Sequence, residues 1–259
     1  MDIVVIVNDN DVIVIEDKVH SNDHGNQLDR YRKIIEEDYS LENIHLVYLK
    51  TGDQSRYFNA KSAGYHLIKR KDLLNVLNKG VESGIKNEIF IDFSIYLNDI
   101  RNSVQSYKKL SLDKWHWDSW KGFYQDLQDM LNKGEWAYVP QKNGGFLGFW
   151  WHWKLGTYEG IEFQYYLQLE HGKMCFKIIV EGDSEARYKI RDMYRRSLYP
   201  KAKELNVPLR QNGRIGRSMT VAALSQGYRQ INSDGSIDMD ATAEYLKSLQ
   251  DLLNSISFE

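Results

Sequence analysis

The chain is poor in cysteine, in proline and in net charge. Its 259 residues include one cysteine and three prolines, and the formal net charge is −2. A single cysteine excludes an internal disulfide framework. Cys175 lies in an apolar run with Met174 and Phe176, so we expect a buried structural thiol. A net charge this close to zero leaves no global electrostatic signal for nucleic acid, and any such surface must be local.

Long apolar runs and several catalytic motifs are also missing. No stretch approaches the roughly 20 apolar residues that a membrane-spanning helix requires. The N-terminal apolar run is short, β-branched and not preceded by basic residues, unlike a signal peptide. We therefore expect a cytoplasmic protein without membrane contact. A Gly-rich phosphate loop, the Cys/His spacing of zinc sites and a Gly-x-Ser-x-Gly elbow are all absent, which narrows the classes of enzyme.

The first 31 residues are the most informative part of the sequence. Two Val/Ile-rich runs, residues 2–7 and 12–18, flank an Asn-Asp-Asn-Asp turn and predict a β-hairpin. Charges lie where these runs end. Alternation along a strand places Glu16 and Lys18 on one face and Asp17 on the other. If Asp2 pairs with Glu16 or with Lys18, all three side chains converge, because residues opposite each other share a face.

Charges at the rim of an apolar sheet indicate a metal site. Two carboxylates and an ammonium are costly there unless they are paired or bound to a metal, and their hard oxygens suit Mg²⁺ or Mn²⁺. Residues 23–38 then predict an amphipathic helix on which Gln27 and Tyr31 share a face. Simple packing of Gln27 at the helix edge would explain this helix alone. With Glu16 and Lys18 upstream, we favour a functional pair.

Together these segments resemble the PD-(D/E)XK nuclease superfamily, and most closely its bacterial branch with a QxxxY motif. The resemblance rests on an acid, a hairpin, a Glu-x-Lys strand, a Gln-x-x-x-Tyr helix and the apolar strand 44–49. It implies a Mg²⁺-dependent (or Mn²⁺-dependent) nuclease, in which a metal-activated water hydrolyses DNA phosphodiester bonds. The implied roles are metal binding by Asp2, Glu16 and the backbone carbonyl of Asp17, water orientation by Lys18, and contacts to that water or to DNA by Gln27 and Tyr31.

The resemblance leaves alternatives open. Family members usually carry a helix before the first acid, often with another carboxylate, whereas here the acid is residue 2. The chain is truncated, or its start is misassigned, or the helix has been lost. The rival to an active nuclease is a catalytically silent module that binds nucleic acid or protein and retains the nuclease fold.

The remaining chain predicts two parts. We expect an α/β protein with a mixed central sheet flanked by helices, a restriction-endonuclease-like core over residues 1–110. A C-terminal α+β portion on an antiparallel sheet, residues 111–259, is expected to pack with the core as one unit. The elements that predict this arrangement are strands at 65–68, 145–154, 160–170 and 173–181, and helices at 71–78, 88–107, 115–132, 183–204 and 241–253.

Arginines supply the candidate DNA contacts outside the hairpin. Arg210, Arg214 and Arg217 lie in a Gly-rich stretch and are the best candidates for phosphate contact, although a solvated loop explains them equally well. Arg30, on the first helix, is a further candidate. The aromatic run 115–120 is typical of a base-stacking platform, but its helical spacing favours core packing.

Overall fold

The computed structural model describes residues 1–21, 23, 25–141, 144–211 and 213–258. Internal contacts divide the chain into two compact units, Met1–Ser103 and Val104–Glu259. The predicted boundary near residue 110, and the packing of the two parts as one unit, stay predictions. None of the helices in the described ranges combines the length and the apolar character needed to cross a membrane.

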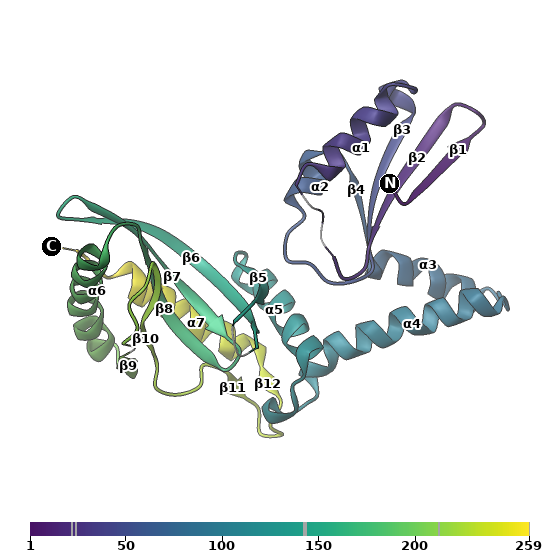
Figure 1. Cartoon of the computed structure of the whole chain (residues 1–259). Helices are drawn as coiled ribbons and strands as arrows, with labels where there is room; N and C mark the ends of the chain where they lie inside the picture. The colour runs from purple at the N-terminus through teal and green to yellow at the C-terminus, as the bar shows by residue number, and fades with distance from the viewer. Residues whose placement is uncertain (22, 24, 142–143, 212, 259) are drawn as a thin grey trace. The chain divides into compact units, whose positions relative to one another are not determined.

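The N-terminal unit is built on a four-stranded mixed sheet (Figure 1). The strand order is β1-β2-β3-β4, with β1 antiparallel to β2 and the other two pairs parallel. Asn8 and Asp9 adopt positive φ in the β1–β2 turn, which their short polar side chains tolerate. The elements of this unit are β1 (Ile3–Val7), β2 (Asp11–Lys18), α1 (Gln27–Glu36), β3 (Ile44–Lys50), α2 (Phe58–Ser62), β4 (His66–Lys69), α3 (Arg70–Glu82) and α4 (Glu88–Gln105), which ends just beyond the division.

One face of this sheet is covered by α1 and α2. Val12 and Val14 of β2 alternate onto that face and are fully buried. They pack in one cluster with residues of α1 and α2, including Leu28. Because side chains alternate along a strand, Glu16 and Lys18 continue the same row and are also buried. Glu16 and Lys18 are thus two charged side chains on the buried face of β2, at the end of its apolar row.

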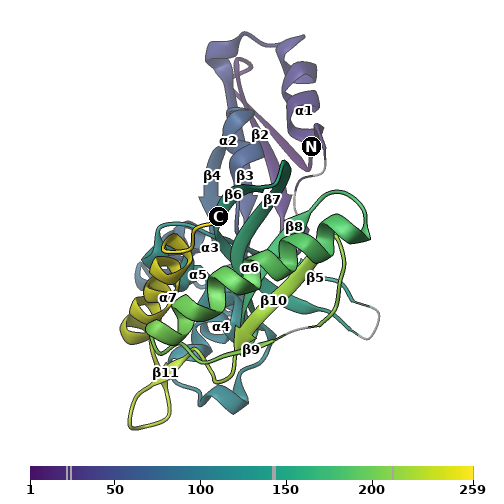
Figure 2. The same ribbon diagram turned by 90° about the vertical axis from the view of Figure 1, so that its left-hand side faces the viewer.

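The C-terminal unit contains a six-stranded antiparallel sheet in the order β5-β6-β7-β8-β10-β9. Three helices contribute with this sheet to one large core, and Figure 2 shows one of them, α6, lying across β8 and β10. Cys175 of β8 is buried, and burial raises its pKa to about 12. The elements are α5 (Trp117–Leu131), β5 (Glu135–Val139), β6 (Phe146–Tyr158), β7 (Ile161–Glu170), β8 (Lys173–Val180), α6 (Ser184–Glu204), β9 (Leu209–Gln211), β10 (Ser218–Leu224), β11 (Gln230–Ile231), β12 (Ile237–Asp238) and α7 (Met239–Asn254).

The expected fold class is confirmed: a mixed sheet flanked by helices precedes an antiparallel sheet with its own helices. The first helix is shorter than expected, beginning at Gln27 rather than near residue 23; His24 lies outside the described residues. In the aromatic run, helical spacing placed Trp117 and Trp120 together in the core; this is confirmed for Trp120 and wrong for Trp117, which is exposed, while Trp115 is buried just before α5 begins.

Candidate active site

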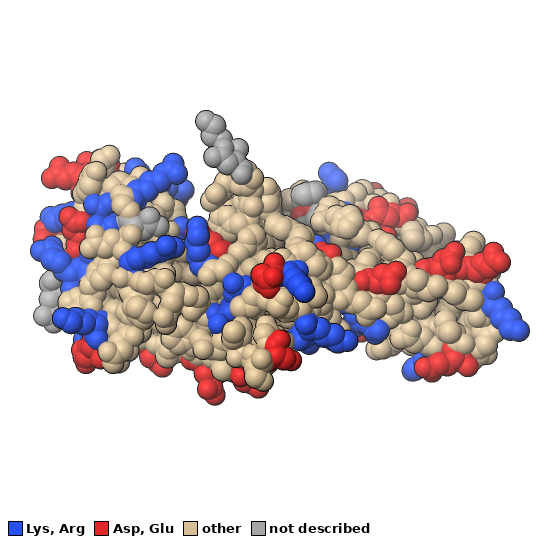
Figure 3. All heavy atoms as spheres, turned by 90° about the horizontal axis from the view of Figure 1, so that it is seen from below, with Lys and Arg blue, Asp and Glu red and all other residues tan. Residues whose placement is uncertain are grey.

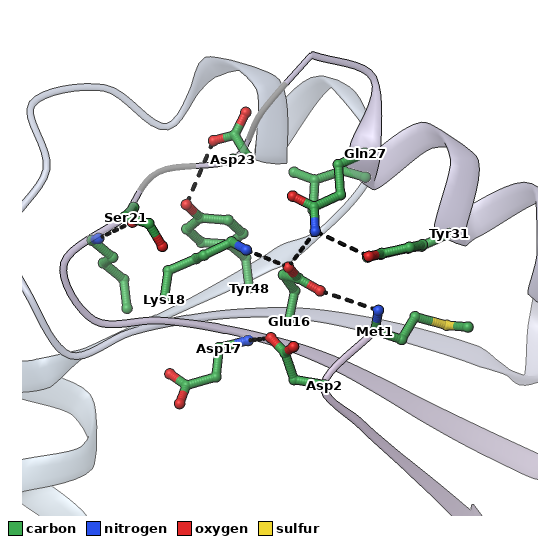
Figure 4. A network of polar contacts seen from close by, with 12 residues as sticks. Met1, Asp2, Glu16, Asp17, Lys18, Ser21, Asp23, Gln27, Tyr31 and Tyr48 are labelled. Carbon is green, nitrogen blue, oxygen red and sulfur yellow. Dashed lines mark hydrogen bonds and ion pairs between the residues drawn. The ribbon is translucent and has the colours of Figure 1, made fainter.

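Glu16 is the centre of the polar network at the end of β2. Its side chain is 1% exposed, and Oε1 accepts hydrogen bonds from Lys18 Nζ at 2.5 Å and from Gln27 Nε2 at 2.9 Å (Figure 4). Oε2 is buried without a hydrogen-bond partner among the described residues, and the Met1 α-amino group lies 3.6 Å from it. This ion pair with the Met1 ammonium offsets part of the cost of burying Oε2 without a hydrogen-bond donor, and it shows that Oε2 is placed to accept a cation.

Lys18 is held in its charged form. Burial lowers the pKa of its ammonium, but the hydrogen bond and charge of Glu16, together with the charge of Asp2, outweigh burial and raise the pKa above its usual value. Lys18 is therefore protonated at neutral pH. In this environment it can donate hydrogen bonds and stabilise negative charge, but it cannot accept a proton from water.

Helix α1 contributes Gln27 and Tyr31 to the same network. These residues are one turn apart, so they point in one direction. Gln27 Nε2 donates to Glu16 Oε1 and, at 3.1 Å, to the Tyr31 hydroxyl. That donation is the main cause of a lowered pKa for Tyr31. The structure thus brings together Lys18, Glu16, Gln27 and Tyr31, all four of which were selected from the sequence.

Asp2 departs from the expected convergence. Its carboxylate accepts a hydrogen bond from the backbone N–H of Asp17 at 2.8 Å, and Figure 4 shows both aspartates on the side of β2 away from Glu16 and Lys18. The reason is that regular pairing begins at Ile3: the N–H of Asp2 bonds to the Ile15 carbonyl, so register no longer dictates the direction of its side chain. Asp17 itself is exposed, on the face opposite to Glu16.

Lys50 is a residue of this region that sequence reasoning missed. It ends β3, directly beside Lys18 in the parallel pairing, and is 1% exposed. Its Nζ donates to the carbonyls of Val19 (3.0 Å) and Ser21 (2.7 Å), and burial lowers its pKa to about 8. Lys50 therefore holds the segment that follows Lys18. Only the strand pairing, which no motif records, could have indicated this role.

Close backbone packing fixes the same segment. A Cβ on Gly52 would lie 1.9 Å from the Val19 carbonyl oxygen, so only glycine allows this approach. Nearby, the hydroxyl of Tyr48 donates to Gln54 at 3.1 Å and lies 3.5 Å from an Asp23 oxygen. These contacts tie the connection between β2 and α1 to the loop after β3, and they help to keep Lys18 in place.

The arginines predicted to contact DNA lie outside the hydrogen-bonded network of Glu16. Arg30 is exposed on α1, with its guanidinium 5.5 Å from the Tyr31 ring centre. Arg210 is exposed on β9, and Arg214 is exposed in the loop before β10. Arg217 is exposed and donates to Glu181, with Nε at 2.7 Å. These last three belong to the C-terminal unit.

Comparison with known proteins identifies the family of the N-terminal part. The family model described as the PD-(D/E)XK nuclease superfamily matches residues 1–129. This part of the chain belongs to that superfamily. No curated protein and no solved structure matched the chain. Membership supports a nuclease-type function in general, and the assignment to the QxxxY branch stays a prediction.

A divalent metal is usual in this superfamily, so its fit to the site matters. No group of three or more His, Cys, Asp or Glu side chains able to hold a metal occurs in the described part of the chain. The expected site has only two side-chain ligands, both carboxylates, together with one backbone carbonyl. Glu16 Oε2, which accepts no hydrogen bond from the described residues and already pairs with the Met1 α-amino cation, and the oxygen-only ligand set suit Mg²⁺ or Mn²⁺. Asp2 satisfies the chemistry of such a site, although its carboxylate faces Asp17 here.

Proposed function

We propose that the N-terminal unit is a Mg²⁺-dependent nuclease that hydrolyses DNA phosphodiester bonds. The observation that carries this proposal is the state of Glu16, a buried carboxylate whose Oε1 is saturated by Lys18 and Gln27 and whose Oε2 lacks a hydrogen-bond donor among the described residues. The metal would be held by Glu16 and the Asp17 carbonyl, and by Asp2 once its carboxylate leaves the Asp17 N–H and turns toward Glu16. It would supply Lewis-acid activation of the attacking water and neutralise charge on the phosphate.

The protein's own residues would position the reactants. Lys18, kept protonated by Glu16, would direct an N–H toward the attacking water or a phosphate oxygen and stabilise the charge that develops there. Gln27 orients Glu16 and Tyr31 at once, and the Tyr31 hydroxyl, which accepts from Gln27, can donate its own proton to water or to the DNA backbone. Burial at the strand end strengthens each of these interactions.

The test is Mg²⁺-dependent cleavage of plasmid and single-stranded DNA, with EDTA as the control. Wild type should cleave, and Lys18→Met should lower the rate by ~10²–10³, the typical cost of removing one preorganised donor. Mn²⁺ titration calorimetry should show that Lys18→Met still binds metal, because the carboxylates remain. A Lys18→Met variant that cleaves as fast as wild type would refute the role of Lys18.

One observation favours the rival, a catalytically silent module. The carboxylate of Asp2 is turned away from Glu16. The two carboxylates therefore do not face one common metal position. A silent module would bind nucleic acid or protein without hydrolysis. Wild-type protein that binds Mn²⁺ in the calorimeter and yet cleaves neither form of DNA would decide for this alternative.

A further inference from the structure

Helix α6 of the C-terminal unit carries an excess of positive charge. It contains seven Lys or Arg residues and three Asp or Glu residues. Three of its arginines, Arg187, Arg191 and Arg195, are four residues apart, so they follow one side of the helix. Figure 3 shows several Lys and Arg side chains on the left of the view, with Asp and Glu side chains among them.

This side of α6 borders the segment that carries the other arginines. Arg191 is 8% exposed, and its Nη1 donates to the Gly213 carbonyl at 3.1 Å, next to Arg214 in the chain. The Nε of Arg187 is buried without a hydrogen-bond partner among the described residues. Glu181 accepts from Arg217, and the charge of Arg187 also acts on that carboxylate. Arg187 and Arg191 of α6 therefore adjoin the segment that carries Arg214 and Arg217.

We propose that Arg187, Arg191 and Arg195 of α6 and Arg210, Arg214 and Arg217 of the β9–β10 segment form one surface, the arginine seam, that binds the phosphate backbone of nucleic acid. Six guanidinium groups outnumber the four acids of residues 181–195 and 209–217, which are Glu181, Asp183, Glu185 and Asp192; two of these acids pair with Arg217 and Arg191. Guanidinium forks match phosphate geometry and need no base contact. The seam deepens the proposed function, because it rests on nucleic acid being the substrate.

The opposite side of α6 provides a matched control. Lys189, Arg196 and Lys203 are exposed. Their mean direction is roughly 140° around the helix from the mean direction of the three α6 seam arginines. Their neighbours also differ: Lys189 pairs with Glu159, and Arg196 lines a cavity with Tyr158. Changing three seam residues or these three control residues to glutamine removes three positive charges from the same unit in both cases, so the comparison tests the location of the charge.

The experiment compares the seam triple Arg187→Gln/Arg195→Gln/Arg214→Gln with the control triple Lys189→Gln/Arg196→Gln/Lys203→Gln. Duplex DNA affinity is measured in EDTA, where cleavage cannot intervene, from 50 to 200 mM salt. Removing one phosphate contact reduces the steepness of log K against log salt by ~0.9. We expect the seam triple to reduce that steepness by roughly 2 to 3, equally for unrelated sequences, and the control triple to leave it nearly unchanged.

Three outcomes would overturn the seam. The first is an equal reduction of the salt dependence in both triples, and the second is no reduction in either. The third is competition by polyglutamate as strong as competition by DNA of the same charge, which would assign the surface to acidic proteins. Arg214→Glu, a single change in an exposed loop, provides the same test if the seam triple does not fold; it should weaken binding several-fold, and unchanged binding would count against the seam. If wild type binds DNA with the expected effect of the seam triple but does not cleave it, hydrolysis is rejected and the seam is retained. If wild type cleaves DNA but the seam triple leaves the salt dependence unchanged, the seam is rejected and hydrolysis is retained.

Discussion

Lys18→Met should lower the free energy of unfolding of the N-terminal unit, in addition to its effect on the rate of cleavage. The ammonium lies 2.5 Å from Glu16 Oε1, and the two side chains are 11% and 1% exposed. Methionine keeps most of the volume but removes the charge, so Glu16 would be left as a buried carboxylate without its closest partner. Removing one member of a buried ion pair typically costs ~3–5 kcal/mol.

The structure places this cost at the lower end of the range. The amide of Gln27 still donates to Oε1, and the Met1 α-amino group is still 3.6 Å from Oε2. We therefore expect a destabilisation of about 3 kcal/mol, equivalent to roughly a 100-fold change in the unfolding equilibrium constant. In the double variant Glu16→Gln/Lys18→Met no buried charge of this pair remains, so its destabilisation should be smaller than that of Lys18→Met alone.

The assay must report on the N-terminal unit. All seven tryptophans lie between residues 115 and 153, so tryptophan fluorescence follows the C-terminal unit and serves as the internal control. Amide hydrogen exchange of peptides from β2 and β3 follows the N-terminal unit, and it should become roughly 100-fold faster in Lys18→Met if these amides exchange through global opening. Exchange within a few-fold of wild type, or a double variant less stable than the single, would refute the reasoning.

Two further predictions concern Lys50 and the metal. Because the pKa of Lys50 is lowered in the folded state to about 8 from 10.5, the unfolded chain binds more protons between these values, and stability should rise with pH there. Relative to Lys50→Met, the free energy of unfolding of wild type should increase by about 3 kcal/mol between pH 7 and pH 10.5, measured by urea denaturation; no increase would contradict the assignment. In Mn²⁺ calorimetry, Glu16→Gln should weaken binding strongly and Asp17→Asn only slightly, and equal weakening would show that the Asp17 side chain is a ligand.

The fold was predictable wherever local periodicity and burial agree. The Val/Ile runs of β1 and β2 and the Asn-Asp turn between them specify the hairpin. In β6 this agreement fails. Alternation holds as far as Trp151, which is buried in step with Leu147 and Phe149, but it would also bury Trp153, which is exposed. The register shifts between Trp151 and Lys154, and His152 has positive φ. A bulge of this kind depends on cross-strand pairing, which a single sequence does not encode locally.

The site was predictable to the extent that its residues share one strand or one helix. Glu16 and Lys18 are two residues apart on β2, and Gln27 and Tyr31 four apart on α1, so local spacing alone fixed their common faces. Asp2 depends on how far strand pairing extends toward the chain end, and Lys50 on which strand lies beside β2. Both are properties of the assembled sheet, so the sequence could not determine them.

The network around Glu16 also limits what the chain can do as a catalyst. Oε1 already accepts two hydrogen bonds, so an incoming cation would bind Oε2, where it would compete with the Met1 α-amino group. The pKa of Lys18 is raised, so its ammonium can stabilise charge but cannot remove a proton from water. Gln27 has no basic group. Lys18 and Gln27 can therefore supply charge and orientation, and we expect a bound metal to lower the pKa of the attacking water. Cleavage that persists at an unchanged rate in EDTA would contradict this division of roles.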